Sequence, residues 1–67
     1  MSDKTYKKIE IVGASADSLS DAIQAGLAKA AETLRHLEWF EVTEIRGAVR
    51  DGKPLYQVTM KVGFRLE

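Results

Sequence analysis

The sequence contains no cysteine, one histidine and one proline among its 67 residues. Without cysteine, neither a disulfide framework nor a thiolate zinc site can form. His36 is the only imidazole, so one chain cannot build a histidine-rich metal site, although carboxylates can still bind a hard cation. A domain of this size buries only about 60% of the surface that its unfolded chain exposes. We therefore expect association of subunits to supply the missing stability.

The chain has no excess of either charge, because ten Lys and Arg residues balance ten Asp and Glu residues. Nonspecific nucleic-acid binding depends on an excess of cations, so we expect no nucleic-acid partner. No apolar run approaches the roughly 20 residues that cross a bilayer. Residues 1–8 also lack the apolar segment of a secretory signal. These features predict a cytoplasmic protein with no membrane partner.

No repeat or flexible linker divides the sequence, so we expect a single domain over residues 1–67, folded from about Lys4 to Leu66. Residues 5–12 alternate and predict a strand that ends at Gly13. One face of this strand would carry Lys7, Ile9 and Ile11, and the other Tyr6, Lys8, Glu10 and Val12.

Apolar residues then recur at spacings of three and four, which predicts an amphipathic helix. They are Leu19, Ala22, Ile23, Gly26, Leu27, Ala30, Ala31, Leu34 and Leu37. Ser18 and Asp21 resemble a capping box at its start. Because the apolar stripe is rich in alanine and glycine, we expect the helix to lie close against a sheet.

Two β-rich runs, residues 39–50 and 55–66, flank Asp51-Gly52, a dipeptide that favours a two-residue type I′ turn. The second run would cover the helix with Tyr56, Val58, Met60, Val62, Phe64 and Leu66. A two-residue turn pairs Arg50 with Lys53, which places Arg46 opposite Gln57 and Glu44 opposite Thr59. The other face of the sheet would then be polar, with Glu44, Arg46, Gln57, Thr59, Lys61 and Arg65. We predict an α+β fold of order β-α-β-β, in which one helix covers one face of a three-stranded antiparallel sheet.

Signals of an enzyme are weak. There is no nucleophilic cysteine or glycine-rich phosphate loop, and the serines near residue 18 suit helix capping. We interpret His36, near the predicted helix end, as a solvated residue stabilised by the helix dipole. Glu41 and Glu44 are three apart on a strand and should point to opposite faces, which argues against a paired acid and base. We expect no catalytic residues.

Trp39 and Gln57 each allow two interpretations. Trp39, the only tryptophan, would either cover the helix end as a hydrophobic plug or stack on a flat aromatic ligand. Gln57 would either be a plain residue of the polar face or hydrogen-bond a heterocycle through its amide. Composition and spacing alone leave both pairs of alternatives open.

Several segments resemble the signature stretches of the bacterial dodecins, in order and over nearly the whole chain. These are Tyr6-Lys7-Lys8-Ile9-Glu10-Ile11-Val12-Gly13, Leu37-Glu38-Trp39-Phe40-Glu41-Val42, Ile45-Arg46-Gly47, Tyr56-Gln57-Val58 and Val62-Gly63-Phe64-Arg65-Leu66-Glu67. Dodecins are small β-α-β-β flavoproteins. The resemblance implies a hollow homododecamer in which pairs of flavins stack between tryptophans of symmetry-related subunits.

The resemblance also implies roles for five residues. Trp39 would stack on the flavin, Gln57 would hydrogen-bond the polar edge of its ring, and Arg46 would lie near it. Glu44 matches a position that is close to the flavin in archaeal relatives, where the residue type differs. Arg65 would contact a phosphate, or the coenzyme A that some members bind as a second ligand.

The function implied is storage of flavin and quenching of its photochemistry, without turnover. We favour FMN, because Arg46, Lys61 and Arg65 would offset its phosphate, with riboflavin and FAD as alternatives. A structural or protein-interaction module without a flavin is the alternative function, and an enzyme that uses bound flavin is a third.

The simple hairpin register puts Trp39 on the opposite face from Arg46 and Gln57. Either a β-bulge between Phe40 and Ile45 reverses the alternation, or the site combines Trp39 of one subunit with Gln57 of another. We expect the second arrangement.

Overall fold

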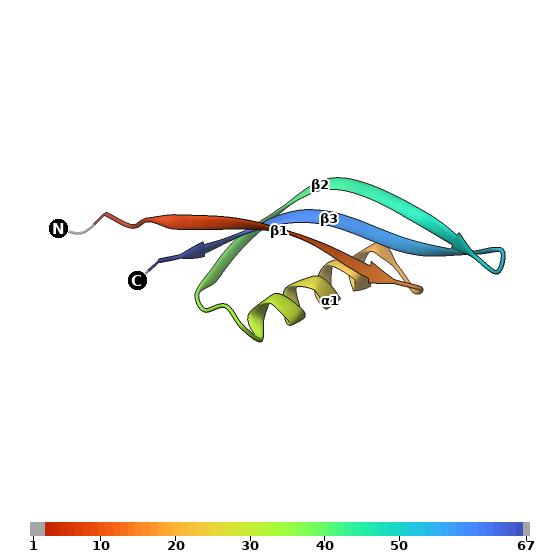
Figure 1. Ribbon diagram of the computed structural model, residues 1–67, viewed down its shortest axis with the longest axis horizontal. Coiled ribbons are helices and arrows are strands. Elements are labelled where there is room, and N and C mark those ends of the chain that lie inside the picture. The colour runs from red at the N-terminus through yellow and green to blue at the C-terminus, as the bar shows by residue number, and fades with distance from the viewer. Residues whose placement is uncertain (1–2, 67) are drawn as a thin grey trace.

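The computed structural model describes residues 3–66. The elements follow the order β1 (Tyr6–Ser15), α1 (Leu19–Ala31), β2 (Leu37–Arg50) and β3 (Lys53–Arg65). The strands form one antiparallel sheet of order β1-β3-β2, and α1 lies across one face of it (Figure 1). The predicted β-α-β-β fold is confirmed, whereas the predicted domain limits at Met1 and Glu67 lie outside the described residues.

The start of α1 follows its sequence signal in part. The Ser18 hydroxyl accepts a hydrogen bond from the backbone N–H of Asp21 at 2.9 Å, as a helix N-cap does. The capping box is incomplete, because the Asp21 carboxylate does not accept a hydrogen bond from the backbone N–H of Ser18. That carboxylate accepts a hydrogen bond from the Ser15 hydroxyl at 2.8 Å instead, which ties the end of β1 to the first turn of α1.

The helix ends at Ala31, earlier than the apolar spacing indicates. Leu34 and Leu37 lie outside it, so the expectation that they continue the helical stripe is wrong. His36 also lies beyond the helix and has a positive φ of 62°, which turns the chain into β2. Leu37 pairs with Phe64 in the sheet. It therefore belongs to β2, although its position in the sequence continues the helical spacing.

Two glycines allow α1 to lie close to the sheet. A Cβ atom at Gly13 in β1 would collide with the carbonyl oxygen of Ala22, and one at Gly26 would lie 2.6 Å from Met60 Cε. Around this contact lies the apolar core, which consists of Ala22, Ala30, Val58, Met60, Val62 and Phe64. The small residues of the stripe therefore serve close packing, as predicted.

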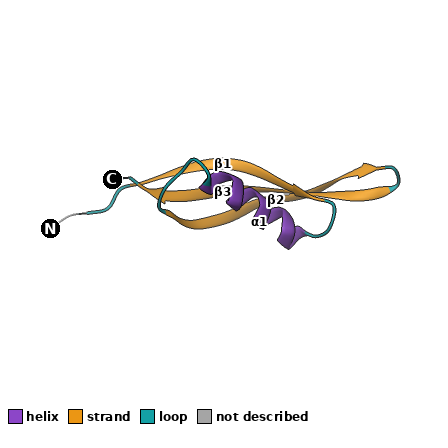
Figure 2. Ribbon diagram, turned by 90° about the horizontal axis from the view of Figure 1, so that it is seen from below, coloured by secondary structure: helices purple, strands orange, loops and turns teal. Residues whose placement is uncertain are grey.

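The helix leaves much of the sheet uncovered. It packs on β1 and β3, while Phe40, Ile45 and Val49 of β2 are 44%, 60% and 81% exposed. Figure 2 shows the β2–β3 hairpin extending well beyond α1. The radius of gyration is 13.9 Å, against about 11 Å for a compact chain of this length. A chain of this shape leaves apolar surface for another subunit to cover.

The hairpin turn forms as predicted. Asp51 and Gly52 have positive φ angles of 52° and 75°, and Arg50 pairs with Lys53. Arg46 lies opposite Gln57, and Glu44 opposite Thr59, also as predicted. At the other end of β3 one detail differs, because Leu66 follows the strand and is 44% exposed, so it does not join the core.

A β-bulge changes the register farther from the turn. Val42 pairs with Met60 and Glu44 with Thr59, so Thr43 is an extra residue in β2. The Thr43 hydroxyl donates a hydrogen bond to the carbonyl oxygen of Thr59 at 3.3 Å. A second register shift lies between Leu37 and Trp39. The bulge at Thr43 reverses the alternation of every β2 residue that precedes it, up to Trp39.

Candidate functional site

The bulge places all five candidate residues on the face of the sheet that points away from α1. We call this the helix-distal face, and its members follow from the register and the alternation of the strands. They are Tyr6, Lys8, Glu10, Val12 and Ala14 of β1, Trp39, Glu41, Glu44, Arg46, Ala48 and Arg50 of β2, and Lys53, Leu55, Gln57, Thr59, Lys61, Gly63 and Arg65 of β3.

Two predictions are corrected by this register. Trp39 shares a face with Gln57 and Arg46, because it pairs with Gly63 on β3. A bulge is therefore present between Phe40 and Ile45, against the expectation of a simple register. Glu41 and Glu44 also lie on one face, opposite Lys61 and Thr59 respectively, instead of on two faces.

The Trp39 indole lies flat over the backbone of Gly63. A Cβ atom on Gly63 would collide with Cε2 and Cζ2 of the indole and lie 2.6 Å from its Cδ2. The Tyr6 ring meets the indole edge-on, with centroids 5.1 Å apart and planes at 65°. Trp39 stays 40% exposed. Its position on the helix-distal face excludes a plug over the helix end and leaves one side of the indole open to a planar ligand.

Gln57 lies at the middle of its row, between Ala14 of β1 and Arg46 of β2. It is half-buried, and Arg46 is exposed. Within residues 3–66 the Gln57 side-chain amide has no hydrogen-bond partner, so its donors and its acceptor are available to a ligand. The sheet thus holds the Gln57 backbone in place, while its side-chain amide makes no hydrogen bond within residues 3–66.

Trp39 and Gln57 are far apart within one chain. The partner of Trp39, Gly63, is six residues from Gln57 along β3, which corresponds to roughly 20 Å. That separation exceeds the length of a fused three-ring heterocycle. One ring therefore cannot contact both side chains of the same chain, even though the bulge puts them on one face.

The other two candidates have partners within the chain. The Glu44 carboxylate accepts a hydrogen bond from the Thr59 hydroxyl at 3.4 Å. Arg65 forms a 3.4 Å ion pair with Glu38, and its Nη2 lies 3.2 Å from Nδ1 of His36. Arg65 thus lies at the Tyr6 end of the face, and Glu44 and Arg46 lie toward the hairpin turn.

Sequence reasoning missed Gly63 and Tyr6, which position the indole. A glycine inside a strand marks the close approach of another group, so Gly63 carried a usable signal. Tyr6 carried none, because its contact with Trp39 joins the two outer strands across β3 and depends on the strand order.

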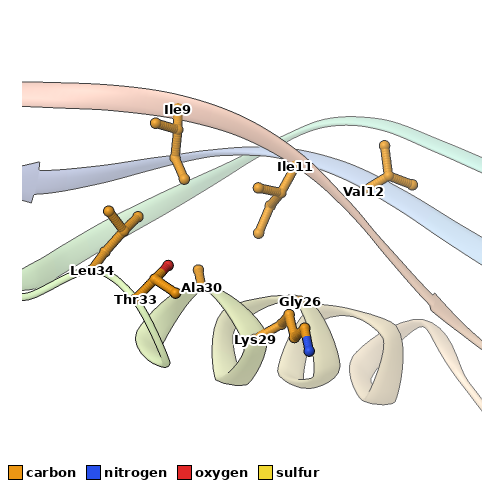
Figure 3. A pocket seen from close by; sticks show the side chains of 8 residues that line it. All are labelled: Ile9, Ile11, Val12, Gly26, Lys29, Ala30, Thr33 and Leu34. Carbon is orange, nitrogen blue, oxygen red and sulfur yellow. The ribbon is translucent and has the colours of Figure 1, made fainter.

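A separate concavity of residues 3–66 lies on the helix side of the sheet. It is an open groove of about 440 Å³ between α1 and β1, shown in Figure 3. Its lining includes Ile9, Ile11 and Leu34 but none of the five candidate residues.

Residues 3–66 contain no group of three His, Asp or Glu side chains that could hold a metal ion. Within the same residues, no helix is both long and apolar enough to span a membrane.

Comparison with known proteins places the chain in a family. Residues 5–67 match the family model named Dodecin. A curated dodecin of Thermus thermophilus is 60% identical over 65 residues, which cover 96% of this chain and 94% of that one. The crystal structure of a Thermus thermophilus protein superposes with a TM-score of 0.93 at 57% identity, over 97% of each chain.

A more distant structure is that of a calcium-binding protein. The calcium dodecin of Mycobacterium tuberculosis is 28% identical, with a TM-score of 0.85 over 94% of this chain and 91% of that one. It is described as carrying a calcium-binding site. The family model and the Thermus relative each cover almost the whole chain, and the chain therefore belongs to the dodecin family.

Proposed function

We propose that this protein stores FMN in the cytoplasm, with pairs of flavins stacked between Trp39 side chains of neighbouring subunits in a homododecamer. Dodecin membership supports a small flavin-binding protein of dodecameric type. The observation that carries the proposal is the Trp39 indole, which rests on Gly63 with one side exposed on the same face as Gln57.

Stacking supplies the binding energy in this account. Each aromatic pair contributes roughly 0.5 to 1.5 kcal/mol beyond the burial of its area. Two flavins between two indoles make three such contacts, which sum to roughly 1.5 to 4.5 kcal/mol. Gly63 and Tyr6 fix the indole before the ligand arrives, so little side-chain freedom is lost on binding.

The polar residues supply orientation. Gln57 hydrogen-bonds the pyrimidine edge of the flavin through its unused amide, and Arg46 lies beside it as a cation for the ligand's negative charge. Glu44 lies one row away, close to the ring but without a direct bond. Arg65 contacts a phosphate or coenzyme A, in competition with its ion pair to Glu38.

Two features of the chain support an assembled site. The separation of roughly 20 Å between the Trp39 and Gln57 rows means that a flavin touching both takes them from different subunits. The exposed Phe40, Ile45 and Val49 leave apolar surface for subunits to bury. Association would also raise the stability of a domain with a small core.

Storage suits this arrangement better than catalysis. A flavin stacked between an indole and a second flavin has no open face for a substrate. Photoexcited flavin held against an indole loses its excitation by electron transfer, which makes the bound form dark. FMN is the favoured ligand, with riboflavin and FAD as alternatives. Calcium is not favoured, since residues 3–66 hold no suitable cluster of acidic side chains.

The test is a titration of FMN with the purified protein, followed by flavin fluorescence, with Trp39→Ala alongside. Saturable quenching at one flavin per subunit, lost in the variant, supports the proposal. Unchanged fluorescence with the wild-type protein contradicts it and favours a structural module without flavin. Size-exclusion chromatography of the variant checks that the loss is not a failure of assembly.

A further inference from the structure

The cations of the helix-distal face differ in whether a carboxylate lies beside them. Lys61 lies opposite Glu10 on one side and Glu41 on the other. Arg65 forms its ion pair with Glu38. These acids partly neutralise the two cations and compete with any anionic ligand for them.

At the hairpin end of the same face the cations are not balanced in this way. Arg46 lies opposite Gln57, and Arg50 and Lys53 lie opposite each other. Within residues 3–66, none of these three side chains forms an ion pair. All three are exposed. Like charges directly opposite each other repel, so an anion bound between Arg50 and Lys53 would relieve an unfavourable contact.

A hollow adjoins Arg50 and Lys53. It has a volume of about 290 Å³ and is lined by Ala16, Arg50, Asp51, Lys53, Pro54 and Leu55. It holds two cations and one carboxylate, that of Asp51, so its lining stays net positive. Of its lining residues, Arg50, Lys53 and Leu55 belong to the helix-distal face, the same face as Gln57.

The spacing from Gln57 suits a flavin nucleotide. Lys53 is four residues from Gln57 along β3, or roughly 13 Å between their Cα atoms. The long side chains of Arg50 and Lys53 can shorten that distance to an anion. A flavin whose pyrimidine edge meets Gln57 can extend its ribityl chain along this face toward the hollow.

We propose that Arg50, Lys53 and this hollow, and not Arg65, bind the terminal phosphate of the flavin whose ring contacts Gln57 of the same chain. The inference rests on the proposed flavin-binding function and deepens it. Arg50 supplies a planar fork that matches phosphate oxygens, and Lys53 supplies a point charge. The subsite makes the protein select phosphorylated flavins over riboflavin, because riboflavin has no anion to place there.

The experiment measures the dissociation constants of FMN and riboflavin for the wild type and for the double variant Arg50→Gln, Lys53→Gln. Lys4→Gln, Arg35→Gln serves as the matched control, because it removes the same charge from exposed positions off the sheet. We expect the FMN constant to rise roughly tenfold in the double variant, with riboflavin and the control little changed. High salt should shrink the difference between wild type and variant.

A charge-retaining variant, Arg50→Lys, Lys53→Arg, checks that the effect comes from charge and not from damage to the hairpin. It should bind FMN more tightly than Arg50→Gln, Lys53→Gln does, because two cations remain beside the hollow. Equal FMN affinity in the wild type and in Arg50→Gln, Lys53→Gln would overturn the phosphate subsite and leave flavin storage standing. Equal losses for FMN and riboflavin would also overturn it. A wild type that binds neither flavin would contradict the proposed function itself.

Discussion

The indole of Trp39 rests on Gly63, and any side chain at Gly63 would occupy the same space. This contact fixes which side of the indole is covered and which is exposed. A glycine with open space beside its Cα atom would tolerate an added methyl group. Gly63 cannot, because the indole fills that space. Gly63 is therefore as much a part of the candidate site as Trp39 itself.

Gly63→Ala is predicted to displace the indole and weaken FMN binding by about tenfold or more, since the stacking surface would tilt or shift. The measurement is the dissociation constant for FMN from fluorescence quenching. Gly47→Ala is the control, because a Cβ atom there would lie 3.5 Å from the carbonyl oxygen of Leu55, which is an ordinary contact. Wild-type affinity in Gly63→Ala would show that the position of the indole on Gly63 is irrelevant to the ligand.

Deletion of Thr43 is predicted to leave FMN binding close to that of the wild type. Without the extra residue, Val42 directly precedes Glu44 and still pairs with Met60, so Trp39 stays opposite Gly63 on the helix-distal face. Fluorescence titration of the deletion variant and of Thr43→Ala, with size-exclusion chromatography to check assembly, tests this. Loss of FMN binding in a deletion variant that still assembles would show that the site needs the bulge itself and not only the face on which Trp39 lies.

Gln57→Ala is predicted to weaken FMN binding by about 1 to 3 kcal/mol, because a hydrogen-bonding edge of the ring would lose its partner on a half-buried surface. Titration calorimetry gives the affinity directly. Thr59→Ala, in the next row of the same strand, provides a control that should change binding far less. If the two variants behave alike, Gln57 has no special contact with the ring.

Gly13→Ala is predicted to destabilise the fold by about 1 to 3 kcal/mol, because the added methyl group would collide with the Ala22 carbonyl oxygen and push α1 from the sheet. Denaturant unfolding at equal protein concentration measures the change, with Gly47→Ala again as the control. An unchanged midpoint would mean that α1 can move away without loss of packing.

Much of the fold could be predicted from local signals. The Asp51-Gly52 turn set the register as far as Glu44 and Thr59. The alternation of β3 identified its buried apolar side chains from Val58 to Phe64, while Tyr56 is only half-buried. Both depend on short-range geometry that the sequence encodes within a few residues.

The errors have a common cause, which is that a single irregular residue alters everything beyond it. Thr43 has no composition that marks a bulge, yet it moves Trp39 and Glu41 to the other face. The helix ends at Ala31, so Leu34 and Leu37 keep helical spacing in the sequence but lie outside the helix. The pairing of Trp39 with Gln57 in one site was indicated only by the family resemblance, because the two rows lie roughly 20 Å apart within a chain.

A crystal structure of the FMN complex would test the central claim most directly. The account predicts an isoalloxazine ring stacked on the exposed side of the Trp39 indole, with a second flavin beyond it. The Gln57 amide of a different subunit should lie within hydrogen-bond distance of the ring's pyrimidine edge. A ring bound in the groove between α1 and β1, or a ring with no contact to Trp39, would contradict the account.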